Sequence, residues 1–245
     1  MIEEHIDIQT ADGLMNTFIV FPKEAGPHPL IFFYMDAPGK REELHDMARR
    51  LASAGYFVVL PNLFYRSSRD FYLKSRTPEA LELMYSYMNT LSPKTSHTDT
   101  QAMLQFAGQH AMADQTRISA LGYCMSGRIV VWAAAQFPDR FASLASIHGA
   151  NMASASPDSP HRWVGKLKCE CYFACAEIDR WAPAADIETL EASLLAAKVH
   201  YTLDWYAGVE HGFVFPKREG IYNAAAAERH WENLFQLFDR TIQNK

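Results

Sequence analysis

The stretch Gly122-Tyr123-Cys124-Met125-Ser126-Gly127 places a nucleophilic side chain among small neighbours, where a buried apolar strand gives way to an apolar helix. A nucleophile with glycine or another small residue two positions away on either side can occupy a strained strand-to-helix turn, which pushes its side chain out above the sheet edge. Bulkier neighbours would collide with the strand or the helix. Because cysteine holds the nucleophile position, the stretch predicts a thiol hydrolase.

A catalytic thiol needs a base, a helix N-terminus or both. The stretch Gly208-Val209-Glu210-His211-Gly212-Phe213 supplies a histidine directly after the last predicted strand, and Asp179 follows the strand before it. A carboxylate at Asp179 would accept the second N–H of His211 and favour the imidazolium that pairs with a thiolate. The order nucleophile, acid, base is that of the α/β-hydrolases. We therefore predict a triad of Cys124, Asp179 and His211.

Helix N-termini present free N–H groups, so the amide of Met125, at the start of the helix after the nucleophile, is a predicted oxyanion donor. The elements that must position these groups are strands alternating with amphipathic helices. This alternation predicts an α/β fold with a mostly parallel central sheet and helices on both faces, entered by an antiparallel hairpin that turns at Asp12-Gly13. Functional groups in such folds gather after the carboxyl ends of strands, where all three triad residues fall.

The predicted elements follow the apolar periodicity and the Gly and Pro stop signals. Strands are expected over residues 3–9, 14–21, 30–34, 56–60, 118–123, 142–147, 168–175 and 200–206, and helices over residues 41–54, 78–89, 98–110, 125–136, 185–198 and 222–241.

The length of 245 residues fits a single α/β domain over residues 1–245. Within it, residues 62–96 loosen into aromatic and polar positions that suit a cap or a substrate-lining segment. A net charge of −5 with scattered lysines and arginines argues against a nucleic-acid partner. The chain has no signal-like start and no apolar run of about 20 residues, which argues against a membrane partner and indicates a cytoplasmic protein.

The four cysteines suit a compartment that keeps thiols reduced. Cys169, Cys171 and Cys175 lie on one face of a predicted strand, without the second ligand pair or the adjacent histidine of a zinc site, so we interpret them as small core residues. Phosphate-loop, dinucleotide and H-E-x-x-H patterns are absent. The sequence therefore predicts a reaction that needs no metal and no organic cofactor.

Three motifs of the chain resemble those of the dienelactone hydrolase family, whose members are cysteine-dependent enzymes of the α/β-hydrolase fold. They are Gly122-Tyr123-Cys124, Asp179 before Trp181-Ala182-Pro183, and His211-Gly212-Phe213. Ser126 replaces a common glycine of the family. The resemblance covers nearly the whole chain and implies hydrolysis of an ester or lactone.

The resemblance also implies a carboxylate that interacts with the nucleophile and controls its ionisation. By position this is Asp36, where the family usually has the longer glutamate, and the alternative is that Asp36 braces its own loop or caps the approach to the helix at Arg41. The amide of Ala37 is the expected second oxyanion donor, because this loop supplies one in α/β-hydrolases.

The namesake enzymes of the family hold the carboxylate of a dienelactone with arginines, one of them a few residues after the histidine. Here the first basic residues in that stretch are Lys217 and Arg218, which argues against dienelactone itself. Arg66, Arg69 and Arg76 are either substitutes for the missing arginine or solvated surface charges. The aromatic character of residues 64–87 favours an apolar or aromatic ester instead. The expected substrate-lining residues are Tyr34, Phe64, Tyr65, His148 and Phe213, with His148 alternatively a loop histidine.

The sequence therefore predicts a hydrolase that cleaves a small-molecule carboxylic ester or lactone through an acyl thioester on Cys124, as a monomer or homodimer. Two alternatives stay open. One is a glutaminase, although the histidine of those enzymes is usually followed two residues later by glutamate, where this chain has Phe213. The other is a non-catalytic binding or redox-sensing module on a hydrolase scaffold.

Overall fold

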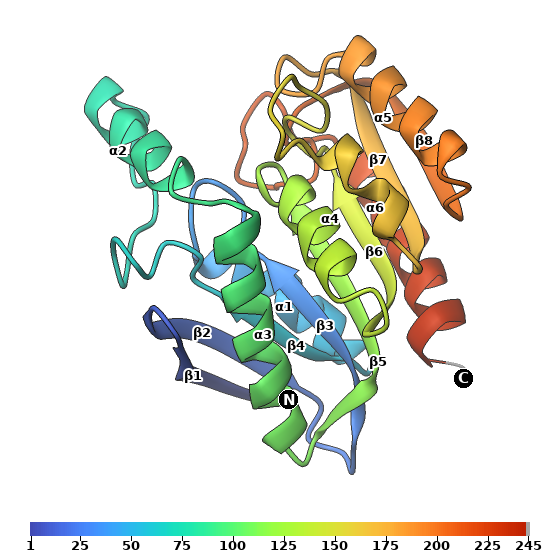
Figure 1. Ribbon diagram of the computed structural model, residues 1–245. Helices are drawn as coiled ribbons and strands as arrows, with labels where there is room; N and C mark the ends of the chain where they lie inside the picture. The colour runs from blue at the N-terminus through green and yellow to red at the C-terminus, as the bar shows by residue number, and fades with distance from the viewer. Residues whose placement is uncertain (244–245) are drawn as a thin grey trace. The chain divides into compact units, whose positions relative to one another are not determined.

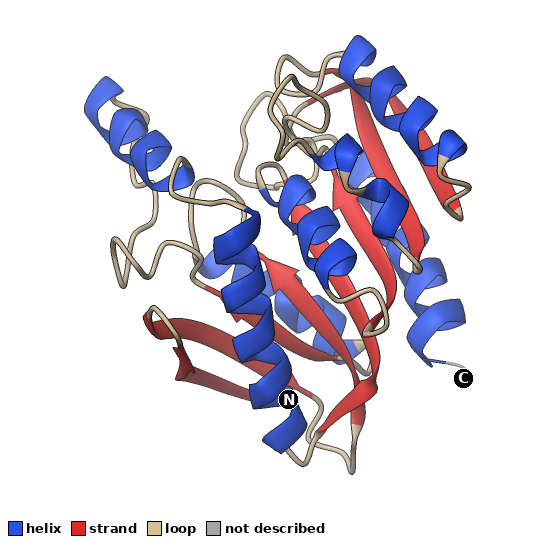
Figure 2. Cartoon of the chain, in the orientation of Figure 1, coloured by secondary structure: helices blue, strands red, loops and turns tan. Residues whose placement is uncertain are grey.

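The computed structural model describes residues 1–243, and the chain divides into two compact units, Met1–Ile118 and the residues from Ser119 onward. Within the described residues, eight strands form one sheet in the order β1-β2-β4-β3-β5-β6-β7-β8. Figure 2 shows strands and helices alternating along the chain. The predicted α/β class is confirmed, and the assignment of all residues to one domain stays a prediction.

The first unit contains four complete strands, three helices and the start of β5. Its elements are β1 (Ile2–Thr10), β2 (Gly13–Phe21), β3 (His28–Tyr34), α1 (Glu42–Ser53), β4 (Phe57–Pro61), α2 (Pro78–Met88), α3 (Pro93–Gln109) and the first part of β5 (Ala113–Tyr123).

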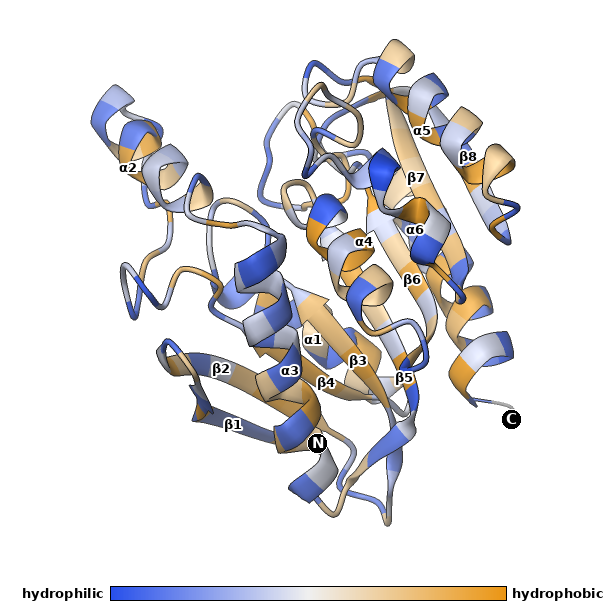
Figure 3. Cartoon of the chain, in the orientation of Figure 1, coloured by the Kyte–Doolittle hydropathy of each residue, from blue (hydrophilic) through white to orange (hydrophobic). Residues whose placement is uncertain are grey.

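The strands of the first unit pair as the sequence predicts. β1 and β2 form the antiparallel hairpin in a register that runs from Ile2 opposite Phe21 to Thr10 opposite Gly13, and β3 lies parallel to β4. In Figure 1, α1 lies behind these strands and α3 in front of them, so the apolar sheet is covered on both faces. Figure 3 shows β2, β3 and β4 as mainly hydrophobic and β1 as mainly hydrophilic.

Two element starts in this unit are wrong in the sequence prediction. Strand β5 begins at Ala113 and not at Ile118. Helix α3 begins at Pro93 and not at Thr98, because Ser92 caps it. The Ser92 hydroxyl accepts the Thr95 N–H (3.3 Å), and the Thr95 hydroxyl accepts the Ser92 N–H (2.9 Å). This reciprocal box normally uses glutamate or glutamine at the second position, which is why the signal was weak.

The second unit holds the rest of β5 and the elements that follow it. These are α4 (Ser126–Gln136), β6 (Phe141–Ile147), short 3₁₀ turns at Pro160–Arg162 and Val164–Lys166, β7 (Glu170–Ile178), α5 (Ala184–Ala196), β8 (Tyr201–Glu210), α6 (Ala224–Phe238) and a π-helical turn, Asp239–Gln243.

In this unit, β6, β7 and β8 are parallel neighbours. Helix α4 lies in front of β6 and α6 behind it in Figure 1. Strand β8 is longer than predicted: its pairing with β7 shifts register between Ala176 and Ile178, where β8 contains the additional residues, and it continues until Glu210 pairs with Ile178. This extension brings the residue after β8 beside the end of β7, so that His211 N–H donates to the carbonyl of Ile178 (3.3 Å).

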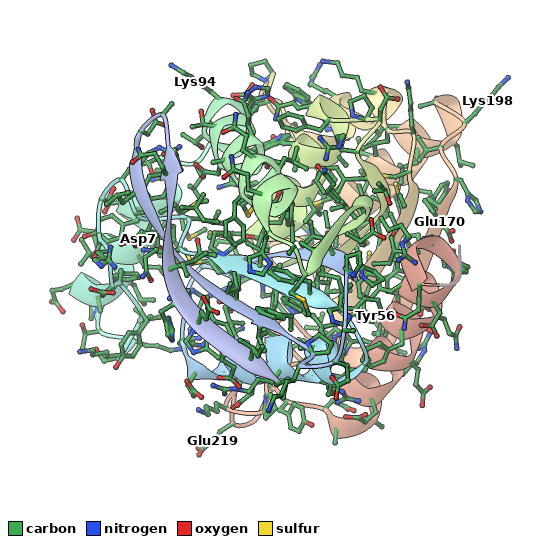
Figure 4. All side chains as sticks on the ribbon, turned by 90° about the horizontal axis from the view of Figure 1, so that it is seen from below. Asp7, Tyr56, Lys94, Glu170, Lys198 and Glu219 are labelled. Carbon is green, nitrogen blue, oxygen red and sulfur yellow. The ribbon has the colours of Figure 1, made fainter. Side chains whose placement is uncertain are left out.

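Figure 4 shows Lys94 of α3 and Lys198, just after α5, pointing away from the protein, as expected for solvated charges on helices. Over residues 1–243, every helix falls short of the length and apolar character needed to cross a membrane.

Candidate active site

The turn between β5 and α4 has the strained geometry that its sequence predicts. Cys124 is partly exposed and has φ of 55°, in the left-handed region that a non-glycine residue rarely adopts. A Cβ on Gly122 would lie only 2.4 Å from the Ser126 carbonyl oxygen and 2.9 Å from the Val130 side chain, so glycine is required there. Close packing of strand and helix therefore presents the sulfur at the end of β5.

Hydrogen bonds hold the main chain of Cys124 on both sides. Its N–H donates to the carbonyl of Ile147 at the end of β6 (3.1 Å), and its carbonyl accepts the N–H groups of Gly127 (3.1 Å) and Ala150 (2.9 Å). Met125 is the N-cap residue of α4, so its amide lies among the first N–H groups of the helix, which have no acceptor within the helix. This placement suits the oxyanion role that remains a prediction for Met125.

Asp179 and His211 come together from the ends of β7 and β8. His211 Nδ1 lies 2.6 Å from Asp179 Oδ2, and the side chain of Asp179 is only 1% exposed. The other carboxylate oxygen, Oδ1, accepts the N–H groups of Trp181 (2.8 Å) and Ala182 (3.2 Å). These bonds fix the carboxylate, and with it the orientation of the imidazole.

Cys124 acts on the same imidazole. Burial lowers the pKa of His211, but the charge of Cys124, the hydrogen bond that the imidazole donates to Asp179 and the interaction with the Cys124 sulfur together raise it to about 9. His211 Nε2 is buried and makes no hydrogen bond of standard geometry with any described residue. Catalytic hydrogen bonds are often long in the absence of substrate. Cys124 therefore contributes to the electrostatic environment of the His211-Asp179 pair, and the triad itself stays a prediction.

Replacing Cys124 by alanine should lower the pKa of His211 from its value of about 9. The variant removes the charge and the hydrogen-bond partner that favour the imidazolium, and leaves burial, which lowers the pKa, opposed by Asp179 alone. An NMR titration of the imidazole measures this shift. Cys175→Ala, which removes a buried thiol from β7, is the matched control and should leave the midpoint unchanged. An unchanged midpoint in Cys124→Ala would contradict the coupling.

Two further predicted site residues lie beside His211 and are fully buried, His148 and Phe213. The His148 ring is 4.7 Å from the His211 ring, centroid to centroid, and the Phe213 ring packs on Tyr206 (4.9 Å). Both nitrogens of His148 lack a hydrogen-bond partner among the described residues, so it is not an ordinary hydrogen-bonded loop histidine.

The remaining predicted substrate-lining residues belong to the first unit. Tyr34 is fully buried and its hydroxyl is 2.9 Å from the Thr100 hydroxyl. Phe64 is also buried, with its ring against those of Phe71 (5.8 Å) and Tyr87 (5.7 Å). The roles of Tyr34 and Phe64 toward a substrate stay predictions.

Tyr65 is half-buried and belongs to a polar cluster. Its hydroxyl donates a hydrogen bond to Asp99 (2.9 Å) and also lies within hydrogen-bond distance of the Thr10 hydroxyl (2.8 Å). Arg66 is part of the same cluster, with its guanidinium bonded to Asp99 (2.7 Å) and to Asp12 (2.7 Å). The two carboxylates therefore already neutralise Arg66.

Asp36 follows β3 and is fully buried. Arg41, the N-cap residue of α1, donates from Nη1 to Asp36 Oδ1 (2.5 Å) and from Nη2 to Oδ2 (3.1 Å). Asp36 thus makes the loop-bracing contact that was the alternative to a catalytic role. Its control of the nucleophile, and the oxyanion role of the adjacent Ala37, stay predictions.

The other arginines considered from the sequence have separate surroundings. Arg69 pairs with Asp7 of β1 (2.8 Å), a residue marked in Figure 4, and Arg76 is exposed. Arg218 has a role that sequence reasoning missed: its Nη1 donates to the carbonyl of His211 (3.2 Å). It lies flat against Gly212, where a Cβ would come within 2.1 Å of Nη1. The glycine after the histidine was the available signal, because it leaves room for such a contact.

All four cysteines are free thiols, and Cys169, Cys171 and Cys175 are buried core residues as predicted. Over residues 1–243, no cluster of three or more histidine, cysteine, aspartate or glutamate side chains is arranged to hold a metal ion.

The model of the dienelactone hydrolase family matches residues 15–242. The chain belongs to the dienelactone hydrolase family. A relative from Synechocystis sp., named "Putative carboxymethylenebutenolidase", is 26% identical over 229 residues and is matched over 92% of each chain. A relative of the same name from Methylorubrum extorquens is 26% identical over 241 residues, which are 97% of this chain and 81% of the relative.

Solved structures confirm the predicted fold of this family member. A Klebsiella pneumoniae protein, described as a "Putative Dienelactone Hydrolase", superposes with a TM-score of 0.88 at 23% identity over 98% of both chains. The acylaminoacyl peptidase of Pyrococcus horikoshii superposes with a TM-score of 0.75 at 16% identity over all of this chain and 42% of the peptidase. With its family established, the protein is a dienelactone hydrolase-like hydrolase.

Proposed function

We propose that this dienelactone hydrolase family member cleaves a carboxylic ester or lactone through a Cys124-His211-Asp179 triad and an acyl thioester. One observation carries the proposal: His211 is bonded to Asp179 at 2.6 Å on one side and has its pKa raised to about 9 by the charge of Cys124. A thiolate and an imidazolium held together are the resting state of a cysteine hydrolase.

In the acylation step, the Cys124 sulfur forms a bond to the substrate carbonyl carbon, and the carbonyl electron pair moves to oxygen. The amide of Met125 at the start of α4, with that of Ala37, is proposed to stabilise this oxyanion. When the electron pair returns, the bond to the alkoxy oxygen breaks, and His211 Nε2 supplies the proton that the leaving alcohol needs. The products are an alcohol and a neutral thioester on Cys124.

The pKa of His211 also matters in the second step, which is hydrolysis of the thioester. The thioester carries no charge, so the largest influence that raises the pKa of His211 disappears while burial, which lowers it, remains. A neutral imidazole is then favoured. It accepts a proton from water, the hydroxide oxygen adds to the thioester carbonyl, and the departing thiolate reforms the ion pair with the imidazolium.

The substrate is proposed to be a small neutral or aromatic ester or lactone. Arg66 is neutralised by Asp99 and Asp12, and Arg218 donates to the His211 carbonyl, so neither is free to hold a carboxylate. Phe64, Phe71 and Tyr87 supply aromatic surface in residues 62–96. The family membership and the relatives named carboxymethylenebutenolidase support including lactones in the proposed substrate class. The free thiols fit a reducing, cytoplasmic location.

Mass spectrometry tests the proposal directly. The protein is mixed with p-nitrophenyl acetate, stopped with acid during the first turnover and digested with trypsin. Cleavage after Arg117 and Arg128 gives a peptide, residues 118–128, whose only cysteine is Cys124, whereas the other cysteines fall within residues 169–180. We expect one acetyl group on the first peptide and none on the second.

Three results would contradict the proposal. An acetyl group on residues 169–180 would assign the chemistry to the buried cysteines, and no adduct across a panel of esters and lactones would support a non-catalytic module. Release of ammonia from glutamine, without ester hydrolysis, would support the glutaminase alternative.

A further inference from the structure

His148 occupies a strained and firmly held position directly after β6. Its φ is 38°, which is rare for a residue other than glycine, and its N–H donates to the carbonyl of Ala174 on β7 (2.7 Å). The next residue is equally constrained, because a Cβ on Gly127 of α4 would lie 2.4 Å from the Gly149 Cα. The backbone therefore has little freedom to move the His148 side chain.

The ring of His148 is enclosed by aromatic groups. It is fully buried, with ring centroids of Phe213, Phe215 and Tyr123 at 5.8, 5.6 and 5.9 Å. The nearest ring is that of His211, at 4.7 Å and an interplanar angle of 63°. This is the edge-to-face arrangement that aromatic pairs favour.

Burial, helped by nearby positive charges, favours the neutral form of this ring. Burial, followed by the charges of His211, Arg218 and His230, holds the pKa of His148 well below its usual value. The imidazolium of His211 therefore faces an uncharged aromatic ring. Such a ring attracts a cation through its quadrupole, whereas a second imidazolium would repel it.

The hydrogen bond to Asp179 does not fix the plane of the His211 imidazole completely. A ring that is held at Cβ and at Nδ1 can still tilt through small coupled rotations of its side-chain torsions, and this tilt moves Nε2 away from the reacting atoms. A second contact on the ring removes the tilt, and His148 provides it.

We propose that His148 is a positioning residue, whose buried ring sets the plane in which His211 presents Nε2 to the leaving group. The inference rests on the proposed function, because it assigns a task within the same reaction. It replaces the expectation that His148 touches the substrate.

The test compares His148→Ala with His148→Phe on a series of acetate esters. A p-nitrophenolate departs without a proton, whereas an alkoxide needs one from His211. With His148→Ala, we expect kcat/KM, which reports acylation and not the shared hydrolysis of the acetyl thioester, to fall about tenfold for p-nitrophenyl acetate and about a hundredfold for alkyl acetates, because a misplacement of about 1 Å can cost 10²-fold. His148→Phe keeps the ring and should restore both rates to within about threefold.

Leu190→Ala is the control for a purely structural loss, because Leu190 is fully buried on α5. It should lower Tm without changing the dependence of rate on the leaving group. An unchanged leaving-group dependence in folded His148→Ala would overturn the proposal. Equal impairment of His148→Phe and His148→Ala would do the same, because it would assign the effect to the nitrogens.

NMR of the His211 imidazole separates this inference from the proposed function, because it needs no substrate. We expect a sharp resonance in wild type and in His148→Phe, and exchange broadening in His148→Ala. If no ester is hydrolysed by the wild type but this broadening occurs, the proposed function fails and the positioning contact stands. A sharp resonance in all three proteins would overturn the inference.

Discussion

Cys124→Ala should lower kcat/KM for p-nitrophenyl acetate by at least about 10³-fold, because the variant has no atom that can form the acyl bond. The oxyanion donors and the His211-Asp179 pair remain, so any residual rate reports their action on water alone. Steady-state kinetics on the folded variant, at matched circular dichroism and Tm, measure the loss.

Two variants sharpen this experiment. Cys175→Ala removes a thiol that is buried on β7 and should keep the rate within about threefold. Cys124→Ser keeps the elbow geometry but exchanges the thiolate for a poorly ionised hydroxyl, and should fall between wild type and Cys124→Ala. Hydrolysis at the wild-type rate by Cys124→Ala would remove the sulfur from the mechanism and favour a binding or redox role.

The fold could be predicted to the extent that local signals are strong. The Asp12-Gly13 turn fixed the first hairpin, and Gly55 after α1 marked where that helix stops. Errors occurred where a signal is weak or comes from tertiary structure. The cap of α3 at Ser92 uses threonine in place of glutamate or glutamine, and β8 extends to Glu210 through a register shift in its pairing with β7.

The contact between Asp179 and His211 could be predicted because each residue follows a strand, and parallel strands bring their carboxyl ends to one edge. Asp179 and His211 are 32 positions apart in the chain and are hydrogen-bonded in the structure. The surroundings of the site could not be predicted. The pairing of Asp36 with Arg41 and the burial of His148 against His211 depend on side-chain directions that no local pattern encodes.

Asp179→Asn should lower kcat by about 10³-fold or more through the tautomer of His211. The carboxylate accepts from Nδ1, whereas an amide NH₂ at that place would donate to it. The neutral imidazole would then carry its proton on Nε2, where it can no longer accept one from Cys124 or from water. The loss of the Asp179 charge also lowers the pKa of His211, and this weakens the ion pair further.

The fold should survive this substitution, because the asparagine oxygen can still accept the N–H groups of Trp181 and Ala182. Glu177→Gln is the matched control, since its carboxylate lies two residues earlier and bonds the N–H of Gly208. It should leave kcat within about twofold. Measurement of kcat and of thermal unfolding for both variants tests this role of Asp179. If Asp179→Asn were as active as Glu177→Gln, Asp179 would act only as a hydrogen-bond acceptor for the turn that leads into α5. His211 would then need another group to set its tautomer.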